Sequence, residues 1–218
     1  MRDRFTIIYL LFFPMDKVIW VRWDSITMWA RDLEKWGRAA RLHSSLWNKY
    51  LRENGDYGVV YNLGIDGDTS FWLVKRFDVE CEARQPDMII FAIGSNDCNI
   101  INNKEFVVSL DSFENNLATL LEKAQKYTEK IVFIGQIICD ESKTNPLPWA
   151  PEMSQDMKHT QLYNDATKTF CKENNLVFID MLDVLSTQDL EDGIHPTAEG
   201  HEKMYVRIKN VLIEKGFI

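Results

Sequence analysis

The hydrophobic residues of the chain alternate between short continuous runs and longer periodic stretches. Five short runs are rich in β-branched and aromatic residues, and they lie at 18–21, 59–61, 88–93, 131–134 and 176–179. Because the apolar positions in each run are continuous, each predicts a strand that is covered on both faces, as in a parallel sheet. The pattern therefore predicts a buried sheet at the centre of the fold.

The stretches between these runs carry apolar residues at three- and four-residue spacing, which predicts amphipathic helices. The expected helices lie at 36–51, 69–84, 113–124, 155–174 and 197–215. Since each strand is followed by a helix, right-handed crossovers give a three-layer α/β/α sandwich with a five-stranded parallel sheet of the flavodoxin-like kind. Ligands in this architecture bind beyond the carboxyl ends of the strands. The stretch 139–154 carries three prolines, and we expect an unstructured loop that shapes a site.

An apolar run of ten residues, 5–14, follows two arginines at the start of the chain. A membrane-spanning helix needs about 20 apolar residues, so this run is too short to cross a bilayer. No Ala, Gly or Ser lies between Phe5 and Lys17, so a cleavage site for a secretory signal is missing. We interpret 1–16 as a hydrophobic extension and 17–218 as a single domain, without stable membrane insertion. A cytoplasmic location is expected, with secretion through an atypical N-terminal signal as the alternative.

The composition excludes some classes of protein but does not identify a reaction. A chain of 218 residues with 45% apolar residues fits one globular domain. The 33 acidic residues exceed the 25 basic ones, and the net charge of -8 argues against a nucleic-acid partner. The four cysteines are far apart in the sequence, which predicts reduced, buried thiols rather than a metal site. We expect no metal and no cofactor, and the oligomeric state stays open.

Polar clusters follow the predicted strands at the edge where this architecture binds ligands. A serine hydroxyl is a weak nucleophile that needs a histidine to accept its proton, and the histidine needs an oriented carboxylate. Ser25, His195 and Asp192 supply these three residue types. A developing oxyanion needs fixed donors, for which the backbone N–H groups of Ser25 and Gly64 and the side-chain amide of Asn96 are suited.

These residues resemble the four blocks of the SGNH hydrolases, also called the GDSL esterase and lipase family. That family carries catalytic Ser, Gly, Asn and His in this order, and the matching positions here are Ser25, Gly64, Asn96 and His195, with Asp192 three residues before the histidine. The blocks span residues 18–205. The resemblance implies a Ser-His-Asp hydrolase that acts on carboxylic esters through an acyl-enzyme, without a metal.

Four further residues have supporting roles in this interpretation. Asp24 and Asp97 are expected to support the turns that hold the nucleophile and the oxyanion donor, and Trp149 is a candidate for the pocket wall. Trp23 stands where the family has a glycine. Because tryptophan does not adopt positive φ at low cost, either the turn stays at negative φ with the indole against a wall, or the site is impaired. The histidines at 43, 159 and 201 are interpreted as packing or surface residues.

The expected substrate is a small-molecule ester with an acetyl or other short acyl group. Longer acyl chains, as in a lysophospholipase or thioesterase, form one alternative, and a pseudoenzyme or a non-catalytic flavodoxin-like binding protein forms another. The segment 22–32 contains no glycine, which disfavours a phosphate cradle after the first strand. A metal-dependent phosphoesterase is also disfavoured, because the blocks offer too few carboxylate and histidine ligands for a two-metal site.

Overall fold

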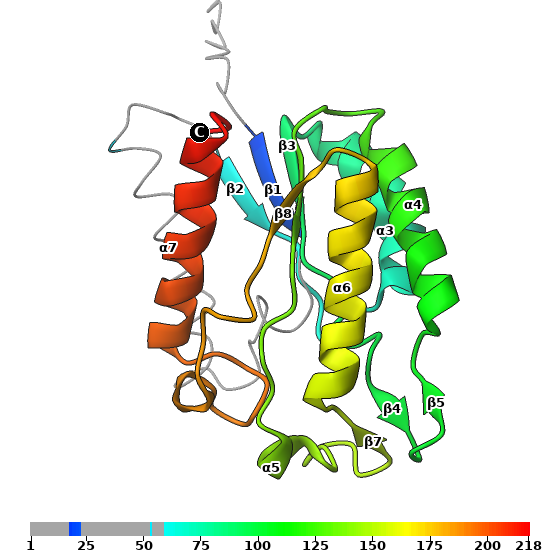
Figure 1. The fold of residues 1–218 in the computed structure, drawn as a ribbon. Helices are drawn as coiled ribbons and strands as arrows, with labels where there is room; N and C mark the ends of the chain where they lie inside the picture. The colour runs from blue at the N-terminus through cyan, green and yellow to red at the C-terminus, as the bar shows by residue number, and fades with distance from the viewer. Residues whose placement is uncertain (1–17, 23–52, 54–58) are drawn as a thin grey trace, which may run out of the picture.

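A parallel sheet forms the centre of the protein, whose computed structural model describes residues 18–22, 53 and 59–218 (Figure 1). Its strands are β1 (Val18–Arg22), β2 (Val59–Asn62), β3 (Met88–Phe91), β6 (Ile131–Ile134) and β8 (Val177–Ile179). They lie in the order β2-β1-β3-β6-β8, and every pairing is parallel. The predicted α/β class with a parallel sheet is confirmed.

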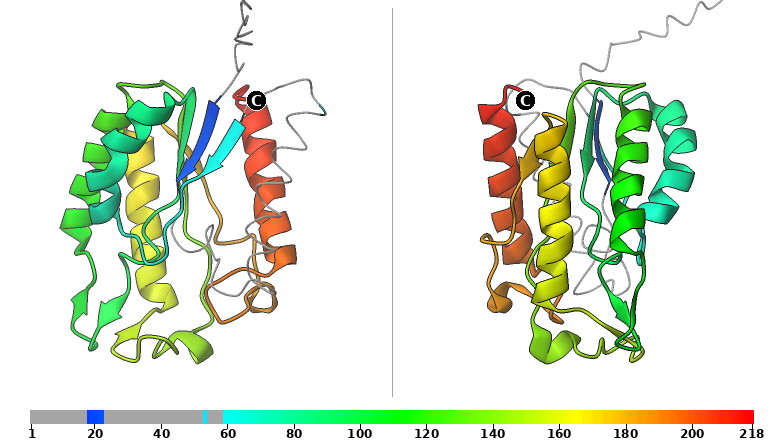
Figure 2. Two further views of the ribbon diagram at one scale, coloured as in Figure 1. Left: turned by 180° about the vertical axis from the view of Figure 1, so that it is seen from behind. Right: turned by 45° about the vertical axis from the view of Figure 1, so that its right-hand side comes forward.

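Helices cover both faces of this sheet. They are α3 (Ser70–Arg84), α4 (Leu110–Ala124), α6 (Met157–Glu173) and α7 (Ala198–Glu214). Figures 1 and 2 show α3, α4 and α6 on one face and α7 on the other. The expected helix at 36–51 lies outside the described residues. No helix in the described ranges has both the length and the apolar character that a membrane crossing requires.

The core consists of two clusters, one on each side of the sheet. Side chains alternate along a strand, so Ile89 and Phe91 of β3 pack toward α3, α4 and α6. Met88 and Ile90 of the same strand pack against α7. This alternation explains why the strand is apolar at every position. All four cysteines are free thiols and buried, as the sequence predicts.

Local capping fixes where the helices begin. Asp156 accepts a hydrogen bond from the backbone N–H of His159 at the start of α6, and Thr197 accepts one from that of Gly200 at the start of α7. Helix α4 begins three residues before the predicted start, because Ser109 caps it. Helix α3 has no side-chain cap from its own N-cap residue, Thr69.

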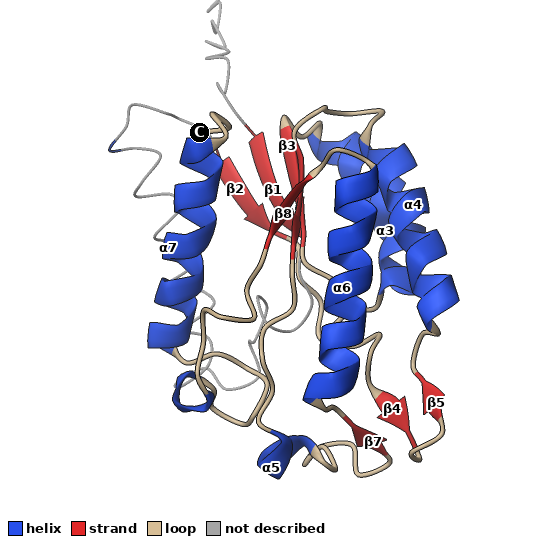
Figure 3. Cartoon of the chain, in the orientation of Figure 1, coloured by secondary structure: helices blue, strands red, loops and turns tan. Residues whose placement is uncertain are grey.

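The loop expected at 139–154 is more ordered than the sequence predicts. It contains the short helix α5 (Glu141–Thr144) and the strand β7 (Met153–Ser154). Strand β7 joins β4 (Ile100–Ile101) and β5 (Glu105–Phe106) in a second, antiparallel sheet of order β5-β4-β7 (Figure 3). The expectation of an unstructured loop is wrong, because two-residue strands are too short to give a periodic pattern.

Candidate active site

Six of the nine predicted site residues lie in the described part of the chain. They are Gly64, Asn96, Asp97, Trp149, Asp192 and His195, whereas Trp23, Asp24 and Ser25 lie outside the described residues. Gly64 follows β2 and Asn96 follows β3, so both lie beyond the carboxyl ends of parallel strands. The topology therefore places the two candidate oxyanion donors at the ligand-binding edge of the sheet.

His195 and Asp192 form a hydrogen-bonded pair in the turn before α7. The Nδ1 atom of His195 is 2.8 Å from one carboxylate oxygen of Asp192. The other oxygen accepts backbone hydrogen bonds from Ile194, at 3.1 Å, and from His195, at 2.9 Å. This carboxylate therefore fixes both the turn and the imidazole, and it assigns the proton of the neutral ring to Nδ1. Nε2 is then the nitrogen that can accept a proton.

The tight turn between Asp192 and His195 depends on Gly193. Gly193 has φ +104°, a conformation that side chains rarely adopt, and a Cβ there would lie 2.8 Å from Cγ2 of Thr144. Its carbonyl accepts a hydrogen bond of 2.8 Å from the backbone N–H of Asp140. The turn that carries the histidine is thus held against the start of α5.

Electrostatics keep the Asp192 carboxylate ionised. Burial pushes its pKa upward, but the hydrogen bonds from the side chain and backbone of His195 outweigh burial and hold the pKa below its ordinary value. His201, one turn into α7, is 2% exposed. Burial and the nearby His195 lower the pKa of His201 to about 4, so it stays neutral near pH 7. Its burial agrees with the interpretation of His201 as a packing residue.

The two candidate oxyanion donors are both held by hydrogen bonds. The Nδ2 atom of Asn96 donates to the backbone carbonyl of Asp68 at 2.9 Å. This bond uses one N–H of the amide and orients the second. The backbone N–H of Gly64 donates to Oδ1 of Asn62 at 3.0 Å. Gly64 therefore serves an oxyanion only when the Asn62 side chain releases that N–H.

Asp97 supports the site by binding the start of α3. Its fully buried carboxylate accepts hydrogen bonds from the backbone N–H of Ser70, at 3.0 Å, and from the Ser70 hydroxyl. Asn116 of α4 in turn donates to that hydroxyl at 2.8 Å. Burial raises the pKa of Asp97 to about 6, although the bonds from Ser70 act in the opposite direction. The carboxylate thus replaces the missing N-cap of α3 and joins α3 to the loop of Asn96.

Trp149 lies beside the candidate base. Its ring centroid is 5.6 Å from that of His195, with 48° between the two planes, and Trp149 is 48% exposed. The predicted pocket-wall residue is therefore adjacent to the histidine. Asp68 and Ser70 hold neighbouring parts of the site, a role that was not predicted from the sequence. The partners of Asp68 and Ser70 lie 28 and 27 positions away.

A second Asp-x-x-His pair lies at the start of α6. Nδ1 of His159 is 2.7 Å from Asp156, and the same carboxylate accepts the backbone N–H of His159 at 2.8 Å. This geometry nearly repeats that of Asp192 and His195. The side chains of His159 and His195 are 19% and 6% exposed, respectively. The local spacing alone therefore does not distinguish a helix cap from a candidate catalytic pair.

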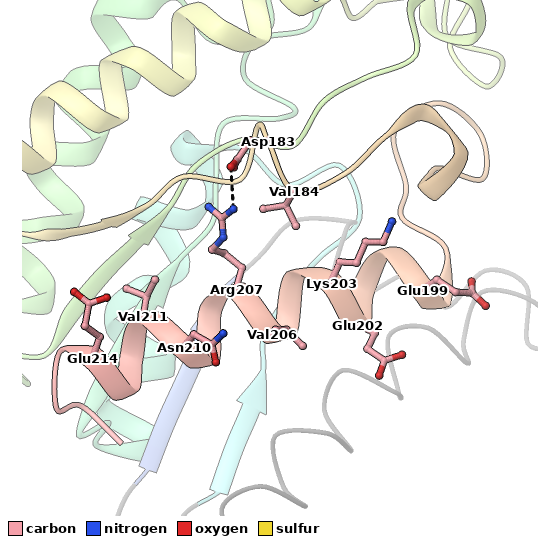
Figure 4. Close-up of a pocket in the computed structure, with 10 residues that line it drawn as sticks. All are labelled: Asp183, Val184, Glu199, Glu202, Lys203, Val206, Arg207, Asn210, Val211 and Glu214. Atoms are coloured by element: carbon pink, nitrogen blue, oxygen red, sulfur yellow. Dashed lines mark hydrogen bonds and ion pairs between the residues drawn. The ribbon is translucent and has the colours of Figure 1, made fainter.

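A hollow of about 700 Å³ lies along α7 and beside Asp183 and Val184 (Figure 4). Its lining includes Asp183 and Arg207, which form an ion pair of 2.9 Å, and none of the predicted site residues. Within residues 59–218 and the other described positions, no three His, Cys, Asp or Glu side chains are grouped to hold a metal.

The fold and the site define an α/β protein with a His–Asp pair and an oriented amide at the ligand-binding edge of its sheet. Residues 24–203 match the model of the GDSL-like Lipase/Acylhydrolase family. The chain belongs to this family.

Similar proteins with known sequences or structures agree with this assignment. An acetylxylan esterase from Geobacillus stearothermophilus is 25% identical over 154 residues, which span 65% of this chain and 66% of that protein. A GDSL-like lipase from Bacteroides thetaiotaomicron has a structure with a TM-score of 0.68 at 22% identity, and the match covers 92% of this chain and 89% of that one. A catalytic mutant of an acetylxylan esterase from Geobacillus stearothermophilus has a TM-score of 0.69 at 19% identity, covering 89% and 93%. The two structures share the fold with this chain.

Proposed function

We propose that this protein is a serine ester hydrolase that uses Ser25, His195 and Asp192 as its catalytic triad. The observation that carries the proposal is the 2.8 Å hydrogen bond between the buried His195 ring and Asp192, at the sheet edge that also presents Asn96. Membership of the GDSL-like lipase and acylhydrolase family supports the assignment of Ser25 as the nucleophile, since residue 24 opens the match to the family model.

In the proposed reaction, Nε2 of His195 accepts the proton of the Ser25 hydroxyl as its oxygen bonds to the ester carbonyl carbon. The carbonyl oxygen becomes an oxyanion, which is stabilised by the Asn96 amide, by the backbone N–H of Ser25 and, once Asn62 has released it, by that of Gly64. The tetrahedral intermediate then expels the alcohol, which takes the proton from His195. Water attacks the remaining acyl-enzyme by the same route and releases the acid. Asp192 holds the imidazole in place and stabilises its charged form throughout.

The proposed substrate carries an acetyl or other short acyl group. The Trp149 ring lies 5.6 Å from that of His195, so a bulky wall stands beside the base. An acetylxylan esterase is also among the relatives of this chain, which supports acetyl groups carried on a carbohydrate. A series of p-nitrophenyl esters tests this preference. We expect kcat/KM to be highest for acetate and to fall as the chain lengthens, whereas a maximum at long chains would favour a lysophospholipase or thioesterase.

A fluorophosphonate probe tests the nucleophile directly. The wild-type protein is expected to be labelled and to hydrolyse p-nitrophenyl acetate, and Ser25→Ala should abolish both properties. Ser142→Ala, at an exposed serine of α5, is the matched control and should be labelled like the wild type. Labelling that persists in Ser25→Ala would refute the assignment of the nucleophile. A wild-type protein that is neither labelled nor active would instead be a pseudoenzyme.

A further inference from the structure

The first turn of α3 exposes two neighbouring aromatic rings. Phe71 is 45% exposed and Trp72 is 56% exposed, and their ring centroids are 5.2 Å apart in an edge-to-face arrangement. The Nζ atom of Lys75 lies 4.0 Å from the centroid of Phe71 and 4.7 Å from that of Trp72. Exposing two neighbouring aromatic rings to water is unfavourable in free energy. Exposed apolar patches therefore mark binding surfaces more often than single exposed apolar residues do.

Two hollows meet at Trp72. The first, of about 440 Å³, is lined by the loop 65–68 together with Trp72, Lys75 and Arg76. The second, of about 610 Å³, continues past Trp72 to the start of α4. Both volumes fall within the range of about 300 to 1,000 Å³ that is typical of small-molecule sites. Trp72 therefore forms a ridge between two adjoining spaces, each large enough for one or two small rings.

The loop that lines the first hollow is joined to the candidate active site. Ile65 contributes to its lining and directly follows Gly64, one of the proposed oxyanion donors. Asp68 also lines this hollow, and its backbone carbonyl accepts the hydrogen bond from Asn96 at 2.9 Å. A ligand that reaches from the oxyanion donors toward α3 would therefore pass along the loop 65–68 to Trp72.

The polar groups around the aromatic ridge suit hydroxyl groups. The second hollow is lined by the hydroxyl residues Ser109 and Ser112 and by the amide residues Asn115 and Asn116. Lys75 adds an ammonium group over the two rings. Amides, hydroxyls and an ammonium group can donate hydrogen bonds to sugar hydroxyls, and the negative face of an indole attracts the partly positive C–H groups of a sugar ring. An acyl chain offers no hydrogen bonds to these polar groups, whereas sugar hydroxyls do, so the surroundings favour a sugar over a lipid.

The ridge is built on a fixed helix start. The backbone N–H of Ser70 is bound by the buried Asp97, and Asn116 of α4 donates to the Ser70 hydroxyl at 2.8 Å. On the next turn of α3, Arg76 bonds to Asp68 at 2.9 Å and to Glu80 at 2.9 Å. These contacts join α3 to the loop 65–68 and to α4. A ring that stacks on Trp72 would thus meet a surface whose orientation is already set.

We propose that Trp72 is the stacking platform of a subsite for an oligosaccharide that carries the scissile acetyl group. A sugar unit distant from the acetylated one stacks on Trp72, and the adjoining unit lies in the hollow of Asn115 and Asn116. This inference rests on the proposed ester hydrolysis at Ser25, and it names an acetylated oligosaccharide of at least three units as the substrate class.

The test compares p-nitrophenyl acetate with acetylated xylo-oligosaccharides of increasing length, using the full chain. In the wild type, kcat/KM is expected to rise with the number of sugar units. Trp72→Ala should leave p-nitrophenyl acetate hydrolysis unchanged and lower kcat/KM on the longer oligosaccharides about tenfold, mainly through KM. Trp72→Phe should retain part of the effect. The matched control is Val79→Ala, which changes a 73% exposed side chain on the same helix that lines neither hollow.

The outcomes separate this subsite from the reaction itself. A wild type that fails to hydrolyse p-nitrophenyl acetate would refute the proposed function. Calorimetry with unacetylated xylo-oligosaccharides would then test the subsite alone. We expect Trp72→Ala to bind these oligosaccharides about tenfold more weakly than the wild type. An active wild type with no dependence on chain length would overturn the subsite. Equal loss by Trp72→Ala on both kinds of ester would also overturn it. So would a dimer in solution that dissociates in Trp72→Ala, because a second copy would then cover the ridge.

Discussion

At the scale of single residues, two Asp–His pairs with nearly identical geometry have different surroundings. Asp192–His195 and Asp156–His159 share the same spacing, the same backbone bond and N···O distances of 2.8 and 2.7 Å. Asp156 is the N-cap of α6, whereas Asp192 belongs to a turn that Gly193 and Asp140 hold at the carboxyl edge of the sheet. The pairing of Asp192 with His195 was predicted from the sequence, whereas His159 was interpreted as a packing or surface residue, although each pair depends on only four adjacent residues. Which pair lies beside a nucleophile depends on topology.

The different surroundings of the two pairs predict different effects of the same substitution, so that Asp156 serves as the control for Asp192. Asp192→Asn should lower kcat on p-nitrophenyl acetate by about 10⁴-fold, because the amide cannot stabilise a charged imidazole and favours the wrong tautomer. Asp156→Asn makes the same chemical change in the same local geometry and should leave kcat within about twofold of the wild type, since asparagine caps a helix nearly as well as aspartate. Steady-state kinetics on the two purified variants provides the measurement. Equal losses in both variants would contradict the assignment of His195 as the base.

At the scale of elements, continuous apolar runs and helical periodicity were sufficient to predict the parallel sheet and the helices that cover it in the described ranges. Strands β4, β5 and β7 could not be predicted, because each has two residues and its pairing partner is distant in sequence. The start of α3 was predicted within one residue. Its capping by Asp97 was not, since that carboxylate comes from a loop 27 positions further along the chain.

The Asp97 carboxylate, which caps α3, should make the free energy of unfolding depend on pH. Burial raises the pKa of Asp97 from 3.8 to about 6, so the folded protein binds this proton more tightly than the unfolded chain does. Between these two values the unfolded state holds fewer protons, and the free energy of unfolding falls as pH rises, by about 3 kcal/mol for this group. The loss is complete above about pH 6.

Asp97→Asn removes this titration. Relative to the wild type, the free energy of unfolding of the variant should therefore rise by about 3 kcal/mol between about pH 4 and about pH 7. Urea unfolding of both proteins across this range measures the difference. The control is Glu122→Gln, which makes a comparable change at a side chain that is 79% exposed in the wild type. If the difference in the free energy of unfolding between Asp97→Asn and the wild type is constant with pH, the Asp97 carboxylate titrates alike in the folded and unfolded states, which would contradict the prediction.

At the scale of the whole molecule, β1 is an inner strand, hydrogen-bonded to β2 on one side and to β3 on the other. The apolar run 5–14 precedes it and lies outside both the described residues and the family match, which begins at residue 24. Residues 1–16 are interpreted as an extension because the run lacks the length of a membrane span and the small residues of a cleavage site. The apolar pattern that predicts the sheet does not indicate which residues the run 5–14 contacts.

The interpretation of the extension predicts the behaviour of two shortened chains. A chain of residues 15–218 retains β1, and its free energy of unfolding and its kcat/KM on p-nitrophenyl acetate should match those of the full chain. A chain of residues 23–218 lacks β1 and leaves β2 and β3 without their shared partner, so it should fail to fold cooperatively. Urea unfolding and steady-state kinetics on the three chains make the comparison. If removal of 1–14 lowers stability by more than about 1 kcal/mol, the apolar run packs against the domain and belongs to its core.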